Sequence, residues 1–256
     1  MEPDDRFSGV ARLYGADGLL RLRQASVAVV GIGGVGSWTV EALARTGLGR
    51  LVLVDLDDIC ITNVNRQIHA VESSRGRSKA EAMAERVRNI HPGCEVVPMV
   101  EFFTRDSADE ILRGPLDVVV DAIDAVGNKC VLISECCRRK IPVVVSGGAG
   151  GRKDPCAIRT ADLALTTHDR LLAEVRSRLR KDYGLLDAGG ASGIPAVFST
   201  EPCLRPTECE SATGAPERGT KPVRLNCDSG YGSACFVTGA FGFAAAAAAI
   251  RLILKS

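Results

Sequence analysis

The segment Gly31-Ile-Gly-Gly-Val-Gly36 decides the fold, because it joins an apolar run to a helical pattern. Residues 25–30 before it are apolar, as in a buried strand, and residues 37–48 after it have helical spacing. A second apolar run, residues 50–54, ends on Asp55 about twenty residues beyond the turn, where a carboxylate would hold a nucleotide ribose. Strand, glycine turn, helix and acidic strand end together predict a nucleotide-binding unit.

Strand-like runs continue along the chain and alternate with helical patterns such as residues 78–90. The predicted strands cover residues 25–30, 51–54, 95–100, 117–121 and 142–147. This alternation predicts an α/β fold with a doubly wound, mostly parallel sheet and helices on both faces. We expect a Rossmann-like arrangement.

The length of 256 residues suits a single domain. We expect residues 1–150 to form the nucleotide-binding core and residues 151–256 to form an extension that faces the substrate. The extension should contain a mobile loop near residues 189–222, which are rich in Gly, Pro, Ser, Thr and Glu. The apolar run 240–254 is short for a membrane span and carries Arg251, so it predicts a buried core helix and no membrane.

Composition narrows the class of protein only slightly. Lys plus Arg total 32 against 31 Asp plus Glu, so no global field indicates nucleic acid, and any RNA contact must be a local patch. The ten cysteines lack the regular spacing of a small secreted domain, and the N-terminus has no signal-peptide pattern. The expected compartment is therefore the reducing cytoplasm.

A polar cluster follows the strand that ends on Asp55. It comprises Asp57, Asn63, Asn65, Arg66 and Gln67. Arginine and amide donors at this point can bind a triphosphate, and the second carboxylate can orient the ribose or hold a metal. A dehydrogenase that transfers hydride has no need of such a cluster, so ATP is a better expected ligand than NAD.

Charged residues also mark two later elements. Lys79 begins the helical pattern 78–90, and a helix N-terminus beside an ammonium group favours phosphate. Asp121 and Asp124 end the run 117–121, and Lys129 follows five residues after Asp124. Because ligands bind at the carboxyl ends of strands in such sheets, Asp124 is placed either to hold Mg²⁺ or to orient a reacting carboxylate.

In combination these features resemble the adenylation domain of the E1-like superfamily, which includes ubiquitin-activating enzymes and sulfur-carrier adenylyltransferases. The resemblance implies that ATP and Mg²⁺ are used to adenylate a carboxylate. It implies catalytic roles for Asp124, Arg66 and Lys79, with the metal at Asp124. The implied ATP-binding residues are Gly31, Gly33, Gly34, Gly36, Asp55, Asp57, Asn63, Asn65, Arg66, Gln67, Lys79, Asp121, Asp124 and Lys129.

Further segments resemble one family in that superfamily, the tRNA threonylcarbamoyladenosine dehydratases. They are residues 6–15, 31–38, 65–69, 146–155 and 162–169 with 175–181. Membership would imply that the carboxylate of N6-threonylcarbamoyladenosine at tRNA position 37 is adenylated, and that an internal nucleophile then closes a ring with loss of AMP. The net change would be a dehydration.

The resemblance also implies partners. It implies a homodimer, in which Arg12 rather than Arg6 would reach the ATP of the partner subunit, and it suggests a cysteine-desulfurase sulfur-relay protein as a further partner. A monovalent cation, Na⁺ or K⁺, is implied between Gly147 and Asp162, although the glycines there suit a flexible connection equally well. tRNA phosphates would bind a basic helix face that is otherwise simply solvated, formed by Arg170, Arg176, Arg178, Arg180 and Lys181.

Cysteine spacing separates this family from its relatives. Sulfur-carrier-activating relatives usually bear two Cys-x-x-Cys pairs for zinc, and none occurs here, so we expect no zinc site and mostly buried cysteines. Cys227 and Cys235 are the best candidates if a thioester forms. Two alternatives remain open: adenylation of a sulfur-carrier or ubiquitin-like protein, and a non-catalytic E1-like scaffold.

Overall fold

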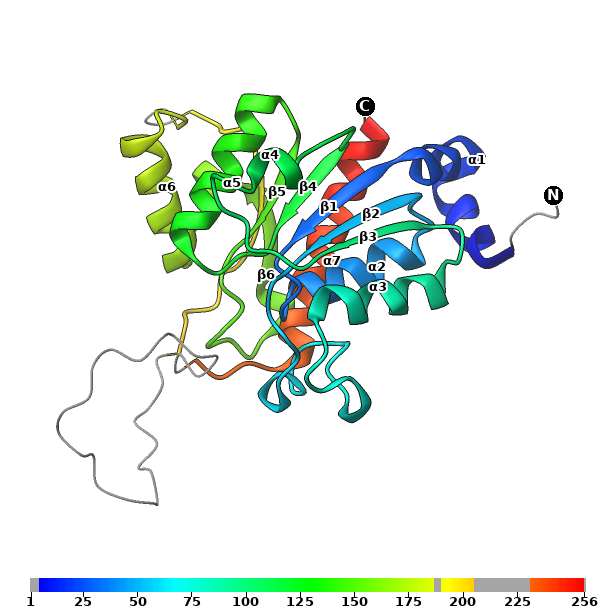
Figure 1. Cartoon of the computed structure of the whole chain (residues 1–256). Coiled ribbons are helices and arrows are strands. Elements are labelled where there is room, and N and C mark those ends of the chain that lie inside the picture. Colours follow the sequence, from blue (N-terminus) through cyan, green and yellow to red (C-terminus); the bar gives the residue numbers. More distant parts are fainter. Residues whose placement is uncertain (1–4, 187–189, 205–230, 256) are drawn as a thin grey trace, which may run out of the picture.

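The computed structural model describes residues 5–186, 190–204 and 231–255, and these form a seven-stranded sheet in the order β3-β2-β1-β4-β5-β7-β6 (Figure 1). The strands are β1 (Ser26–Val30), β2 (Arg50–Val54), β3 (Glu95–Met99), β4 (Val118–Asp121), β5 (Val143–Ser146), β6 (Ile158–Asp162) and β7 (Pro195–Ser199). Only β6 runs antiparallel to its neighbour, which is β7. The prediction of a doubly wound, mostly parallel α/β sheet is confirmed.

Helices cover both faces of the sheet (Figure 1). They are α1 (Ser8–Gln24), α2 (Gly36–Arg45), α3 (Lys79–Ile90), α4 (Ala108–Ile111), α5 (Val126–Arg139), α6 (Arg170–Asp182) and α7 (Cys235–Lys255). Short 3-10 turns occur at Asp5–Phe7, Ile61–Asn63, Glu72–Ser74, Pro155–Ala157 and Leu163–Leu165. Side chains of α1, α2, α3 and α7 form the core on one face, and those of α4, α5 and α6 form the core on the other.

The strand sequences explain this three-layer arrangement. Every residue of β1 is buried, and its side chains alternate between the two cores. Val27 and Val29 belong to one core, whereas Ala28 and Val30 belong to the other. A central parallel strand is covered on both faces, so it reads as a continuous apolar run rather than an alternating one.

Helix α7 is the central helix of its layer. It packs most extensively against α2, and it also contacts α1 and four strands, β4 to β7. The core helix predicted over residues 240–254 is confirmed, and it begins five residues earlier, at Cys235. Within the described residues it is the one helix long and apolar enough to cross a membrane, but 61% of its most apolar window is buried inside the protein.

One sequence prediction is wrong for part of its range. The loop expected over residues 189–222 contains β7, which lies between β5 and β6 in the sheet. The run Pro195–Ser199 is short, begins with a proline and is followed by Thr200, so its strand character depends on pairing with two distant strands. The rest of that predicted loop, apart from residues 190–204, lies outside the described residues.

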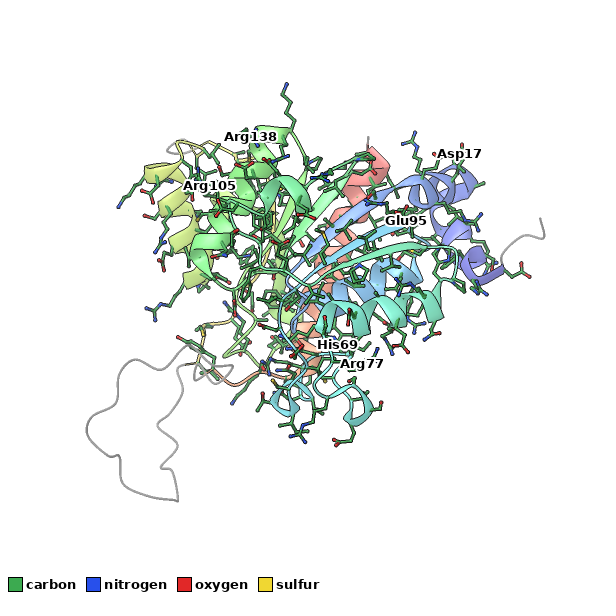
Figure 2. All side chains as sticks on the ribbon, viewed as in Figure 1. Asp17, His69, Arg77, Glu95, Arg105 and Arg138 are labelled. Atoms are coloured by element: carbon green, nitrogen blue, oxygen red, sulfur yellow. The ribbon has the colours of Figure 1, made fainter. Side chains whose placement is uncertain are left out.

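The order of strands also locates a crevice. From β1 the chain continues outward through β2 and β3, and then returns to add β4 and β5 on the other side of β1. Figure 2 shows Glu95, at the start of β3, on the same side of the molecule as Asp17 of α1. His69 and Arg77, from the segment after β2, lie toward the opposite ends of the strands. Ligands of doubly wound sheets bind at these carboxyl ends, between the two strands where the order of strand addition reverses.

The close approach of α7 to α2 predicts different effects for two glycines of α7. A Cβ at Gly242 would lie 2.6 Å from both the Trp38 Cβ and the Val35 carbonyl oxygen, whereas a Cβ at Gly239 would lie 3.6 Å from the Trp38 ring. We expect Gly242→Ala to lower the free energy of unfolding by about 1–3 kcal/mol through overpacking. The matched control Gly239→Ala should be neutral or should stabilise by up to about 1 kcal/mol through helix propensity. Urea unfolding measures both, and equal effects would contradict the close packing.

Candidate active site

A large pocket lies at the carboxyl ends of β1, β2, β4 and β5. Its volume is about 1080 Å³, at the upper limit of the range usual for small-molecule sites. Eleven of the predicted site residues line it: Gly31, Gly33, Gly34, Asp55, Asp57, Asn65, Arg66, Gln67, Lys79, Asp124 and Arg170. The strand order therefore brings together residues that are up to 139 positions apart in the sequence.

The glycine turn is shaped by two close backbone approaches. Gly31 has a φ of 89°, and a Cβ there would lie 2.8 Å from the Ala122 carbonyl oxygen at the end of β4. A Cβ on Gly36 would lie 1.8 Å from the Gly31 carbonyl oxygen. Gly36 is buried and does not line the pocket, so its part in the site is to let α2 begin directly after the turn. The residues just before α2, Gly33 to Val35, line the pocket, so the N-terminus of this helix lies beside it.

Asp55, at the end of the neighbouring strand β2, binds the backbone of the glycine turn. The Ile32 N–H donates to Asp55 Oδ2 at 2.6 Å, and the Asp57 N–H donates to Oδ1 at 2.9 Å. Burial raises the pKa of Asp55, while the nearby ammonium group of Lys79 opposes that rise. A carboxylate with lone pairs remaining at the pocket surface is suited to accept hydrogen bonds from ribose hydroxyl groups.

The basic residues of the pocket are held by short polar contacts. Lys79 is buried, and its Nζ lies 2.7 Å from Asp57 Oδ2. The Arg66 guanidinium donates to the Thr62 carbonyl at 2.7 Å. The Arg66 carbonyl in turn accepts from Trp38 Nε1 at 3.0 Å and from the Thr238 hydroxyl at 3.1 Å. These contacts tie the polar cluster to α2 and α7.

Three predicted ATP-binding residues lie behind the pocket wall. Asp121 and Lys129 form an ion pair at 2.9 Å, with both side chains fully buried, and burial raises the pKa of Asp121. Asn63 is also buried, and its Oδ1 accepts from the Cys60 N–H at 3.0 Å. None of the three lines the pocket. Asp124, in contrast, is exposed in the pocket and has no hydrogen-bond or ion-pair partner among the described residues.

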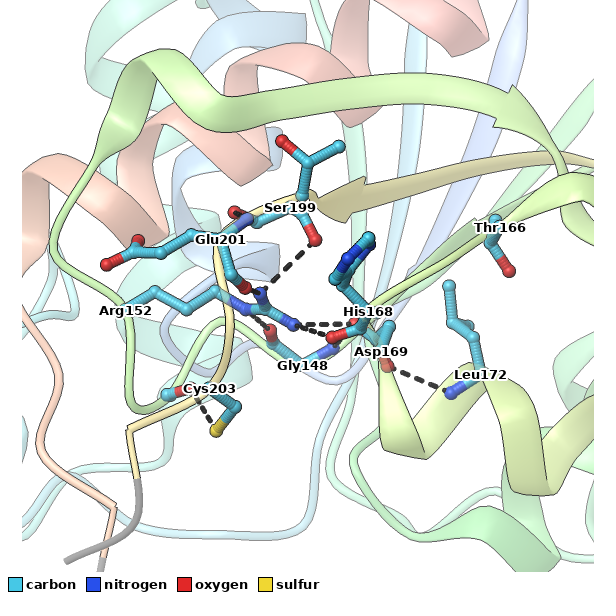
Figure 3. A network of polar contacts seen from close by, with 12 residues as sticks. Gly148, Arg152, Thr166, His168, Asp169, Leu172, Ser199, Glu201 and Cys203 are labelled. Atoms are coloured by element: carbon cyan, nitrogen blue, oxygen red, sulfur yellow. Dashed lines mark hydrogen bonds and ion pairs between the residues drawn. The ribbon is translucent and has the colours of Figure 1, made fainter.

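The far wall of the pocket is held by the buried guanidinium of Arg152 (Figure 3). Its Nε donates to the Gly148 carbonyl at 2.8 Å, and its Nη1 donates to the carbonyls of Ser199 and Glu201. Its Nη2 donates to the His168 carbonyl at 3.2 Å and to the Asp169 carboxylate at 3.3 Å. The monovalent cation expected between Gly147 and Asp162 stays a prediction, and several carbonyls that would suit a cation near this turn accept from Arg152 instead.

The basic residues of α6 lie in different surroundings. Arg170 lines the pocket, and Arg178, Arg180 and Lys181 lie further along the helix. Arg176 is half-buried and donates to the Thr166 hydroxyl. This face has the charge that suits a nucleic-acid backbone beside the pocket.

Arg12 does not reach the pocket of its own chain. It is exposed on α1. This helix ends directly before β1 begins, so it lies at the amino ends of the strands, whereas the pocket lies at their carboxyl ends. Any contact between Arg12 and the pocket therefore requires a second subunit.

The prediction that most cysteines are buried is correct for some of them and wrong for others. Cys94, Cys130 and Cys136 are buried as predicted, and burial raises the pKa of the Cys94 and Cys130 thiols to about 11. The expectation of burial is wrong for the exposed Cys60, Cys156 and Cys235, which lie in surface turns and at a helix start. Within the described residues no group of three or more potential metal ligands occurs. Cys209 and Cys227 lie outside these residues, and the absence of zinc stays a prediction.

Sequence reasoning missed several residues of the pocket. They are Phe102, Phe103, Thr104, Asn128, Leu171, Cys203, Tyr231 and Thr238. Each lies in a connection after a strand or near a helix end, and no local pattern distinguishes it from other surface positions. Asn128 shows how they are positioned, since its side-chain amide donates to the Phe103 carbonyl at 2.6 Å and so holds the segment after β3 against α5.

A doubly wound sheet whose pocket joins a glycine turn, a carboxylate at a strand end and several cationic side chains defines an E1-like nucleotide-binding protein. The chain belongs to the ThiF family, which matches residues 8–256. It is 46% identical over 250 residues to the tRNA threonylcarbamoyladenosine dehydratase of Escherichia coli (strain K12), covering 97% of this chain and 93% of the relative. It is 46% identical over 253 residues to the protein of that name from Haemophilus influenzae, covering 98% and 94%.

Solved structures agree with this assignment. The structure of the E. coli tRNA N6-threonylcarbamoyladenosine dehydratase, TcdA, in complex with ATP has a TM-score of 0.86 to this chain. The two are 43% identical, and the match covers 98% of this chain and 94% of that one. The E1-like resemblance inferred from the motifs is therefore confirmed.

The buried ion pair behind the pocket predicts a large effect of removing one partner. Lys129→Met should lower the free energy of unfolding by about 3–5 kcal/mol, because it leaves the Asp121 carboxylate buried without its cation. The double variant Lys129→Met/Asp121→Asn should be destabilised much less, since it removes both charges. Urea unfolding of both variants measures the difference, and an additive destabilisation in the double variant would contradict this account.

Proposed function

We propose that this chain uses ATP to dehydrate N6-threonylcarbamoyladenosine in tRNA, as a single-domain enzyme of the cytoplasm. One observation carries the proposal: the pocket is large enough for a nucleotide and a second ligand, and its two halves differ. The half over β1 and β2 contains the glycine turn, Asp55 and Lys79, whereas the half over β5 contains Arg170. Similarity over almost the whole chain to dehydratases of that name supports the same conclusion.

In the nucleotide half, the chain would bind ATP with groups that are already in place. The α2 N-terminus and Gly31 to Gly36 would receive phosphate oxygens, and Asp55 would accept from the ribose. Arg66, Asn65, Gln67 and Lys79 would bind the phosphates and neutralise their charge. Lys79 is suited to this, because Asp57 is its only ion-pair partner within the described part of the chain and both residues line the pocket.

The reaction would proceed in two steps. A carboxylate oxygen of the modified adenosine attacks the α-phosphorus of ATP, and the bond to the β-phosphate breaks to release pyrophosphate. An internal N–H or O–H nucleophile of the substrate then attacks the activated carbonyl carbon and releases its proton to solvent, the ring closes and AMP leaves. Asp124, which is exposed in the pocket, would orient the reacting groups.

Asp124 also fits a role in holding Mg²⁺. Mg²⁺ in nucleotide sites is usually held by one or two carboxylates together with phosphate oxygens and waters. Asp124 offers such a carboxylate without a competing partner among the described residues. The ion would supply charge neutralisation at the phosphates. Several carbonyls near this turn accept hydrogen bonds from Arg152, so a monovalent cation would have to bind other oxygen atoms of the region.

Partners follow from the surfaces around the pocket. tRNA would bind along α6 through Arg170, Arg178, Arg180 and Lys181. In a homodimer, Arg12 would reach the ATP site of the other subunit. A sulfur-relay protein of the cysteine-desulfurase type is a further candidate partner, suggested by the family resemblance alone.

The alternatives differ in measurable ways. An enzyme that adenylates a sulfur-carrier protein would exchange pyrophosphate in response to a carrier ending in Gly-Gly and not in response to tRNA. A non-catalytic scaffold would be expected to lack Arg66, Lys79 or Asp124, and all three are present in the pocket.

Asp124→Asn should abolish the reaction while leaving the fold intact. The amide keeps the size of the side chain but removes the charge that would hold the metal or orient the carboxylate, so we expect turnover to fall at least a hundredfold, on the order of the effect of removing one stabilising group from an active site. The assay is incubation with ATP, Mg²⁺ and tRNA carrying the modification, followed by nucleoside mass analysis for loss of one water. Unchanged turnover would remove Asp124 from the mechanism.

The basic face of α6 predicts a salt-dependent contribution to tRNA binding. Arg178→Ala/Lys181→Ala should weaken binding and should reduce the slope of log K against log salt concentration by about 0.7–0.9 for each tRNA phosphate that the variant no longer neutralises. Arg251→Ala, on the exposed side of α7, is the matched control. Equal slopes in the double variant and wild type would place the tRNA elsewhere.

A further inference from the structure

Arg152 is an unusual residue in the pocket wall, because its charge is buried and every one of its N–H donors is used. Its side chain is 2% exposed, and its five donors reach four backbone carbonyls and one carboxylate. The acceptors come from three separate segments: the glycine turn after β5, the start of α6 and the end of β7 (Figure 3). One side chain therefore joins three segments at the second half of the pocket.

One of these acceptors belongs to a residue in an uncommon backbone conformation. His168 has a φ of 57°, the left-handed region that non-glycine residues rarely adopt. Its carbonyl accepts from Arg152 Nη2 at 3.2 Å. Such a conformation is strained and persists only where the surroundings hold it. Arg152 supplies one of the interactions that hold this turn.

The next residue connects the turn to α6. Asp169 is the N-cap, and its Oδ1 accepts from the Leu172 N–H at 2.9 Å. Its Oδ2 accepts from the Gly148 N–H at 2.9 Å and from Arg152. A single carboxylate thus fixes the start of α6 against both the glycine turn and Arg152.

The residue after the cap is Arg170, the first residue of α6. It lines the pocket, is exposed and has no hydrogen-bond or ion-pair partner among the described residues. The direction of its side chain depends on the backbone of the turn before it. Asp169 and His168 set that backbone, and both bind Arg152.

We propose that Arg152 is a positioning residue that acts through Arg170. By holding the left-handed turn and the N-cap of α6, Arg152 places the Arg170 guanidinium in the second half of the pocket, where it binds an oxyanion of the incoming tRNA. That oxyanion is the carboxylate of the modification or a phosphate beside it. The inference rests on the proposed function, because it takes the second half of the pocket as the tRNA side.

The test measures the binding of tRNA and the KM for ATP separately. Arg152→Lys keeps the charge but has too few donors for five acceptors, and Arg170→Ala removes the group that it positions. Each should weaken binding of modified tRNA, measured without ATP, by about tenfold, as expected when one charge-assisted hydrogen bond is removed. The KM for tRNA should rise by a similar factor, while the KM for ATP should stay within about twofold of wild type.

A double-mutant cycle distinguishes positioning from a general structural role. If Arg152 acts through Arg170, the variant Arg152→Lys/Arg170→Ala binds tRNA no more weakly than Arg170→Ala alone. Adding His168→Gly to Arg152→Lys should restore part of the affinity, since glycine adopts the left-handed turn without strain. Lys153→Ala, whose exposed side chain is next in sequence, is the matched control and should bind as wild type does.

Several results would overturn the inference: wild-type tRNA affinity in Arg152→Lys, multiplied losses of affinity in the double variant, or an equal rise in the KM for ATP. If Arg152→Lys does not fold, Asp169→Asn replaces it, because Asn keeps the N-cap acceptor and removes the charge that faces Arg152. Unmodified tRNA identifies the oxyanion: weaker binding of modified tRNA alone indicates the carboxylate, and equally weaker binding of both indicates a phosphate. Failure of wild type to dehydrate modified tRNA would refute the proposed function, and the binding cycle would still decide the role of Arg152.

Discussion

The site depends on the close approach of the glycine turn to the ends of two strands. The Gly31 N–H donates to the Val54 carbonyl of β2 at 2.9 Å, and the Ala122 N–H after β4 donates to the Val30 carbonyl at 2.9 Å. A Cβ on Gly31 would collide with the backbone after β4. This approach brings Asp55 and Asp124 to one pocket, and it exists only because the turn has no side chain at that point.

Charge is distributed unevenly around that pocket. Behind its wall, the cation Lys129 is neutralised by the buried Asp121. At its surface, Lys79 pairs with the half-exposed Asp57, and Asp124 and Arg170 have no partner in the described part of the chain. Buried charges are costly unless they are paired, whereas exposed charges in a cleft remain available to a ligand. The division separates residues that stabilise the fold from residues that can bind phosphate or carboxylate.

Some of the structure could be predicted from local pattern. The strands β1 to β5 are apolar runs, and each was predicted to within one residue at either end. The strands β6 and β7 were missed, since Ile158–Asp162 is half polar and Pro195–Ser199 is embedded in loop-like sequence. Their strand character comes from pairing with each other and with β5, which local pattern does not report.

The sequence by itself determined the nucleotide-binding unit, because a glycine turn, a strand-end carboxylate and a polar cluster each express a local requirement of backbone geometry or charge. It also determined the family, through motifs spread along the whole chain. Only the tertiary structure decided which charged residues face the pocket. Lys79 and Lys129 look alike in sequence, as do Asp121 and Asp124, but the fold places one of each pair behind the pocket wall and the other in the lining of the pocket. The role of Arg152 likewise depends on residues up to 49 positions away, which meet it only when β7 enters the sheet.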